Sequence, residues 1–241
     1  MAEKKTTTAT TITDEPLDKA RGFWASYSKP IIYIGSTIIV LILGWYAYQE
    51  FIVAPKEQKA SEALFPAESL FDNMVATSFG PDSAALVLNG GNLEGRKITG
   101  VLKVIKDFGG TKPGNRARYI AGATYLHIKQ FDKAINYLED FDANGAHQVE
   151  SKAHIMMGHA YAELNKTEKA LEHYRKASRV NKKDDSITPE ALLLAASYAE
   201  STGKHKEAIE IYTELRDTYP AYSAVRSGDV DKYLARLGVL K

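Results

Sequence analysis

The chain of 241 residues contains no cysteine, and this excludes disulfides, thiolate nucleophiles and zinc sites built on cysteine. It also lacks an excess of charge of either sign, since 31 basic and 30 acidic residues give a formal net charge of +1. A balanced chain has little long-range attraction for phosphate backbones. We therefore expect no nucleic-acid partner.

Catalytic and cofactor motifs are missing as well. No serine or threonine stands in a nucleophile-elbow context, and the glycine-rich stretches 89–95 and 109–114 lack the Gly-Lys-Ser/Thr ending of a phosphate loop. His154 and His159 are five residues apart, about 140° around a helix, so their side chains diverge. The remaining histidines, expected mostly at the surface or in a groove, are His127, His147, His173 and His205. We predict no catalytic residue, metal, cofactor or small-molecule substrate, and hence no enzyme.

One apolar run interrupts this polar composition. Ile31 to Tyr48 is eighteen residues long without a charged side chain. As an α-helix it would span about 27 Å, close to the ~30 Å hydrocarbon core of a bilayer. Aromatic residues flank it, as they do at membrane interfaces; they are Trp24, Tyr27, Tyr33, Trp45, Tyr46 and Tyr48. No Ala-x-Ala-like cleavage site follows, so we predict an uncleaved transmembrane helix over residues 30–53.

Flanking charge predicts the orientation of that helix. Five basic residues precede the run, and two follow it within about twenty positions; they are Lys4, Lys5, Lys19, Arg21 and Lys29, against Lys56 and Lys59. Because positive charge stays in the cytoplasm, the N-terminus should lie inside and the C-terminal part outside. Residues 1–22 are Thr-rich and charged, which predicts disorder. Residues 1–29 are thus assigned as a cytoplasmic tail and interfacial segment.

Residues 54–114 are predicted to form a helical connector. Apolar residues recur at three-and-four spacing across 55–79, and Pro66 should kink or split that helix. A helix lying on the membrane surface is the alternative. Beyond it, loops rich in glycine and proline surround two short helical runs, Ser83–Leu88 and Ile98–Asp107, which would form a degenerate repeat.

From residue 115 onward the chain repeats one pattern. A small residue, an alanine twelve positions later and a bulky residue four beyond that recur with spacings of 36 and 38 residues. The three copies are Gly122, Ala134 and Leu138; Gly158, Ala170 and Tyr174; and Ala196, Ala208 and Tyr212. Such periods are typical of a solenoid of stacked helix pairs. Turns within the pairs are predicted at Lys129-Gln130, Asn165-Lys166 and Thr202-Gly203.

This pattern resembles the tetratricopeptide repeat (TPR). Tyr125 and Tyr161 follow the small residues by three positions, and Pro220 stands where the family places its proline. The aromatic residue expected near each repeat's start is instead Arg118, His154 or Leu192. The resemblance implies an all-α fold, with a TPR α-solenoid over residues 115–241 behind the transmembrane helix. Asp229–Leu240 is predicted to be the capping helix.

The resemblance also implies a peptide-binding groove. On the family pattern its lining comprises Arg116, Tyr119, Ala123 and His127; Lys152, Ile155, His159 and Glu163; and Glu190, Leu193, Ser197 and Ser201. Tyr119 and Ala123 stand where repeats that clamp a terminal carboxylate use Lys and Asn, so such a clamp is not expected. Alternatively, some of these residues pack on 54–114 and leave no open groove.

The whole layout resembles the bacterial ancillary SecYEG translocon subunit (YfgM-like) family, in Phe23-Trp24, Tyr27–Pro30, Phe51–Lys59 and Gly109–Asn115. It implies a single-pass inner-membrane protein with a periplasmic domain. The partners of such a protein would be the SecYEG channel and either periplasmic folding factors or secreted client chains. Its role would be that of an adaptor or holdase. A generic membrane-anchored scaffold for envelope assembly or cell division is the alternative. Gly35, Ser36 and Gly44 would permit close contact of the transmembrane helix with a partner helix.

Overall fold

The computed structural model describes residues 15–239 and divides into two compact units, Met1–Pro55 and Lys56–Lys241. The first unit contains helix α1 (Glu15–Tyr48), followed by the π-helical segment η1 (Gln49–Val53). The predicted disorder of residues 1–14 lies outside the described residues, and for 15–22 it is wrong, because α1 begins at Glu15. Pro16 suits a first helical turn, and extending an existing helix is far easier than nucleating one.

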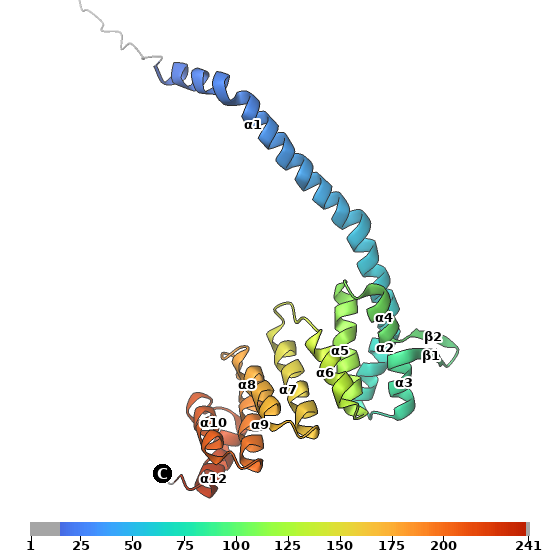
Figure 1. The fold of residues 1–241 in the computed structure, drawn as a ribbon, viewed down its shortest axis with the longest axis vertical. Coiled ribbons are helices and arrows are strands. Elements are labelled where there is room, and N and C mark those ends of the chain that lie inside the picture. Colours follow the sequence, from blue (N-terminus) through green and yellow to red (C-terminus); the bar gives the residue numbers. More distant parts are fainter. Residues whose placement is uncertain (1–14, 240–241) are drawn as a thin grey trace, which may run out of the picture. The chain divides into compact units, whose positions relative to one another are not determined.

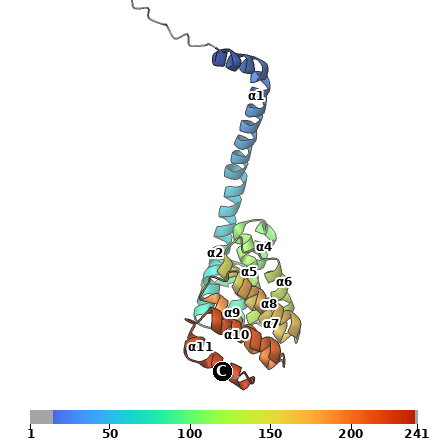
Figure 2. The same ribbon diagram turned by 90° about the vertical axis from the view of Figure 1, so that its left-hand side faces the viewer.

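From residue 31 to residue 48, α1 carries no charged side chain on any face. Val40 and Leu41, adjacent in sequence, are 66% and 67% exposed. In the described part of the chain, the continuous helical stretch Lys19–Ala76 is the only one long and apolar enough to cross a membrane. Its most apolar segment of 18 residues contains no residue that is buried within the protein. The stretch includes the predicted span. Pro30 lies inside α1, and the helix bends near its N-terminal end (Figure 2).

The second unit opens with α2 (Ala54–Ala76), which contains Pro66 without being split by it. Of the two predicted effects of Pro66, a kink or a split, the split does not occur. Leu64 and Ala67, beside the proline, are fully buried, and this packing holds both halves of α2 in place. With Phe71 and Met74 they join the core formed by the next three helices.

A short β-hairpin corrects the expectation of an entirely helical chain. Strands β1 (Gly90–Leu93) and β2 (Arg96–Thr99) pair antiparallel between α3 (Pro81–Asn89) and α4 (Val101–Phe108). Glu94 and Gly95 both have positive φ, 50° and 79°, as a two-residue hairpin turn requires. The sequence gives little sign of this hairpin, because its strands lack the alternation of β-branched and polar residues.

Three helix pairs follow, as the repeat pattern predicted (Figure 1). They are α5 (Lys112–His127) with α6 (Phe131–Glu139), α7 (His147–Glu163) with α8 (Thr167–Arg179), and α9 (Ile187–Ser201) with α10 (His205–Thr218). Two short helices, α11 (Ser223–Arg226) and α12 (Asp229–Arg236), close the domain. The predicted turns are confirmed: Lys129, Asn165 and Gly203 adopt φ of 60°, 57° and 77° at equivalent positions.

The small residues of the repeat stand where the paired helices come closest. A Cβ atom added to Gly122 would lie 2.5 Å from Leu138 Cγ, and one added to Gly158 would lie 2.4 Å from Tyr174 Cε1. In the third pair the equivalent residues, Ala196 and Tyr212, are both buried. The spacing found in the sequence is therefore a contact between the two helices of each pair.

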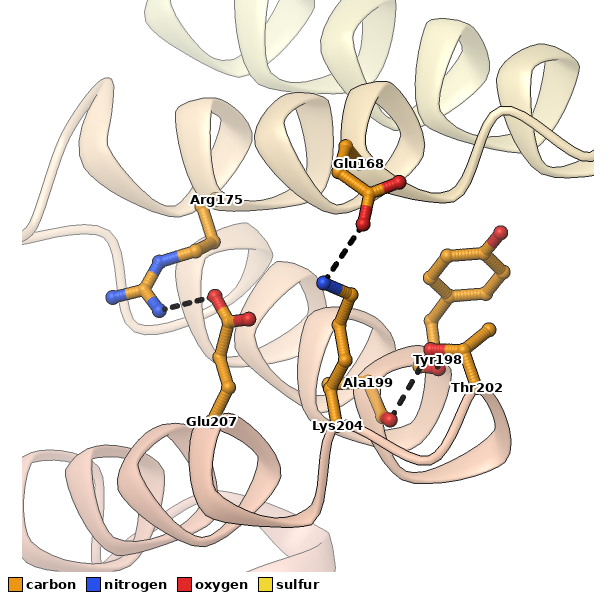
Figure 3. A network of polar contacts seen from close by, with 7 residues as sticks. All are labelled: Glu168, Arg175, Tyr198, Ala199, Thr202, Lys204 and Glu207. Carbon is orange, nitrogen blue, oxygen red and sulfur yellow. Dashed lines mark hydrogen bonds and ion pairs between the residues drawn. The ribbon is translucent and has the colours of Figure 1, made fainter.

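Ion pairs connect successive repeats at equivalent positions. Lys204 contacts Glu168 at 2.9 Å, and Lys166 contacts Asp132 one repeat earlier at 3.7 Å. Figure 3 shows the first of these beside a second link, in which Arg175 on α8 donates to Glu207 on α10 at 3.1 Å. In the same view Thr202 donates its hydroxyl to the carbonyl of Ala199, which closes the turn ahead of α10 (Figure 3). Exposed ion pairs contribute little to the free energy of unfolding, so we expect these links to affect the alignment of neighbouring repeats more than the stability of the domain.

Substitution of Gly158 by alanine tests the close contact. The Tyr174 ring cannot move aside freely, because its hydroxyl is 2.9 Å from His159 Nδ1 and its edge contacts Tyr198. We expect Gly158→Ala to lower the free energy of unfolding by about 1–3 kcal/mol, measured by urea denaturation. Gly110→Ala is the control, because a Cβ there meets nothing within 4 Å. Equal stability of the two variants would contradict the assignment.

Candidate protein-binding groove

The first helices of the three pairs, α5, α7 and α9, stack in order and contact one another. The predicted groove positions lie on these helices. In the first repeat they are already engaged by the chain itself: Arg116 contacts Glu68 of α2 at 3.2 Å, and His127 stacks on Phe79 with ring centroids 3.7 Å apart. Ala123 is buried, and Tyr119 packs against Phe141. Residues 54–114 thus contact two of the predicted positions of the first repeat, Arg116 and His127, although the Arg116 side chain stays 53% exposed.

The second repeat leaves its positions open, with one exception. Lys152 and Glu163 are exposed, and His159 is half-buried with its Nδ1 2.9 Å from the Tyr174 hydroxyl. Ile155 does not line a groove, because it is buried in a cluster with Ala177 of α8 and Ile187 of α9. A helix position that faces the groove on the family pattern faces the next repeat here.

In the third repeat Glu190 and Ser201 are exposed. Leu193 is half-buried against the core, and Ser197 lies 3.2 Å from the Tyr212 hydroxyl. Ser197 and Ser201 border a hollow of about 630 Å³ between α9, α10 and α12.

Helix α12 supplies groove residues that the sequence did not reveal. Arg236 donates to Glu200 of α9 at 2.7 Å, and its guanidinium lies over the Tyr233 ring. Tyr233 in turn packs against Tyr212. The repeat pattern could not identify Tyr233 and Arg236, because α12 lies outside the three copies and resembles none of them. Phe79 was missed for the same reason, since it precedes the first copy.

Two further hollows mark where a partner could lie. One, of about 370 Å³, sits where α5 and α7 end, between His127, Phe131, His159 and Glu163. The other, of about 390 Å³, borders α2 and has apolar walls from Phe71, Tyr119, Ile120, Phe141 and Val149. The open surface therefore begins beside α2 and extends past α7 and α9 to α12.

Charge in this groove comes from few groups. Burial lowers the pKa of His127, and burial lowers that of His159 although Glu163 and Glu190 act to raise it. Both imidazoles are therefore neutral at pH 7. Glu200 is paired with Arg236. The exposed charges at predicted positions of the second and third repeats are then Lys152, Glu163 and Glu190, and their sum is negative.

Within residues 15–239, no three His, Asp or Glu side chains stand together as a metal-binding group. The expectation that the histidines are mostly at the surface fails for His173, which is 8% exposed. His154 and His159 diverge as predicted: one contacts His173, the other Tyr174.

The stacked helix pairs and the groove along their first helices define a repeat domain of the protein-binding class. Residues 155–223, from within α7 past the end of α10, match the family model of the tetratricopeptide repeat. The comparison with curated proteins gave no match. The chain thus contains a TPR region, and TPR domains bind protein partners and are typically scaffolds without enzymatic activity.

Proposed function

We propose that this protein is a membrane-anchored TPR adaptor, held by the span 30–53 and binding extended protein segments along the groove from α7 to α12. The observation that supports it most is the difference between the repeats. In the first repeat Arg116 and His127 are held by Glu68 of α2 and by Phe79, whereas the second and third keep Lys152, Glu163, Glu190 and Ser201 exposed without such partners from residues 54–114.

The exposed surface of α1 supports the anchor. A core helix of comparable hydropathy would bury most of its apolar side chains, whereas those of α1 face outward on all sides. Such a surface needs a lipid or protein environment. The basic residues ahead of the span favour a cytoplasmic N-terminus and an external repeat domain, which in a bacterium would be the periplasm.

The finer proposal is an accessory subunit of the Sec channel, an adaptor or holdase for emerging chains or for periplasmic folding factors. It rests on the sequence resemblance around the span. A generic scaffold for envelope assembly or cell division is the second candidate, favoured by the TPR match alone. The two differ in whether the span itself recognises a partner.

Gly35, Ser36 and Gly44 are the proposed contact face of the span. At about 100° per residue, Gly35 and Gly44 lie half a turn apart on opposite faces of the helix, whereas Ser36 and Gly44 lie about 80° apart and can face one partner helix. The Ser36 hydroxyl donates to the carbonyl of Tyr33 at 3.1 Å, which satisfies it without a partner. The small side chains, and not a hydrogen bond, would then set the contact.

Topology is testable because the chain has no cysteine of its own. We expect Ser223→Cys, on an exposed position of α11, to react with a membrane-impermeant maleimide in cells with a permeabilised outer membrane. Ala20→Cys, ahead of the span, should react only after lysis. The opposite pattern would place the repeat domain in the cytoplasm and rule out the periplasmic assignment.

Crosslinking from the span separates the two candidates. A photo-crosslinking residue at Val40, on the side of Ser36 and Gly44, should capture a subunit of the Sec channel in native membranes. Leu41 is the matched control, since it is equally exposed and at nearly the same depth but points about 100° away. Strong capture at Val40 and weak capture at Leu41 support recognition by the span. Recovery of no channel subunit from either position would reject the translocon assignment.

The negative groove predicts a preference for basic segments. Two labelled unstructured peptides of equal length and apolar content, one with lysines and the other with glutamates, serve as probes. Fluorescence anisotropy should show tighter binding of the lysine peptide, and the double variant Glu163→Lys/Glu190→Lys should weaken it by about tenfold.

The matched control is Glu210→Lys/Glu214→Lys, two exposed glutamates on α10 in the other helix layer, which should leave binding within about twofold. Equal effects of the two double variants would mean that net charge alone governs binding. The groove assignment would then fail.

A further inference from the structure

His154 on α7 and His173 on α8 face each other across the second helix pair, away from the groove residues. Their Nδ1 atoms are 3.3 Å apart and their rings are tilted by 59°. The His173 ring also packs against Tyr161, which fixes its position. Both histidines border a hollow of about 450 Å³ below the loop that joins α6 to α7. A small ion in this hollow would lie beside both side chains.

The separation of the two nitrogens suits a shared metal ion as well as a direct hydrogen bond. Hydrogen bonds donated by N–H groups are usually about 2.7–3.2 Å long, and only one of the two Nδ1 atoms could donate while the other accepts. Two imidazole nitrogens bound to tetrahedral zinc at about 2.0–2.1 Å are about 3.3–3.4 Å apart. Burial lowers the pKa of His154, and lowers that of His173 to about 4, so both rings are neutral. Neutral imidazole is the form that binds metal.

A third ligand is within reach on the same helix. Glu150 precedes His154 by four residues, so the two side chains lie on one face of α7, and Glu150 borders the same hollow. Its carboxylate now lies 3.8 Å from His147 Nδ1. Lys176 is the opposing charge, but its ammonium group contacts Glu172 at 2.6 Å. The charges around the hollow therefore do not exclude a cation.

We propose that His154 and His173 bind a divalent transition-metal ion, with zinc as the best match, and that Glu150 and water complete its coordination. Imidazole and carboxylate ligands suit zinc, and their tetrahedral arrangement joins α7 to α8. Because His159, which borders the groove, lies on α7 and contacts Tyr174 of α8, the ion would stabilise the repeat that carries the open groove. Affinity should be modest, since only two ligands are in place beforehand.

Titration of the full-length protein, purified without a histidine tag, tests the site. At pH 7.5 we expect calorimetry to show one Zn²⁺ per chain, and Co²⁺ to give visible d–d absorption in the range of tetrahedral complexes. Zinc at a hundred times its Kd should raise the thermal midpoint by about 5 °C or more. Absence of binding, or a Co²⁺ spectrum of the hydrated ion only, would overturn the proposal.

Variants separate this site from ordinary surface histidines. His154→Gln and His173→Gln should each weaken zinc binding by about a hundredfold or more, whereas His205→Gln, an exposed histidine on α10, should not change it. Glu150→Gln should weaken it by about tenfold, and an unchanged affinity would remove Glu150 from the site. Because His173 is buried, metal-free stability is measured in EDTA for every variant. Zinc affinity retained by folded His154→Gln would overturn the assignment.

Discussion

The repeat domain depends on the close approach of the two helices within each pair. Gly122 against Leu138 and Gly158 against Tyr174 leave no room for a side chain on the glycine. This contact fixes the distance between first and second helix, and therefore how much of each amphipathic surface remains for the next repeat. The third pair meets the same need with Ala196 and Tyr212, so a small residue is required and glycine is only one solution.

Stacking then creates a surface that must be closed at both ends. At the start of the domain α2 and Phe79 cover the first repeat, and at the other end α12 packs against α10 and places Tyr233 against Tyr212. Terminal repeats of a solenoid need such caps because one of their faces has no neighbour. The consequence for function is a short groove, limited to the second and third repeats and to the edge of α2.

Polar groups within the domain serve two different roles. The ion pairs between successive repeats, Asp132 with Lys166 and Glu168 with Lys204, recur at equivalent positions. The contact of Tyr174 with His159 recurs in the third pair as Tyr212 with Ser197, whereas among the described residues the contact of His154 with His173 belongs to the second pair alone. Features shared by all repeats explain the fold, whereas the features of a single repeat are those that could distinguish one partner or ligand from another.

The sequence by itself determined the helix pairs, their turns and the apolar span, because spacing and composition are local properties of the chain. The turns at Lys129, Asn165 and Gly203 were predicted from repetition, and the structure added their positive φ. Much of the candidate site was not. Ile155 was expected in the groove but is buried between repeats, and Arg116 and His127 are taken up by Glu68 and Phe79. The hairpin 90–99 and the approach of His154 to His173 gave no sequence signal. Only the tertiary structure decided these points, because the packing of the helices determines which residues meet across them. A repeat pattern specifies that packing only where every copy is the same.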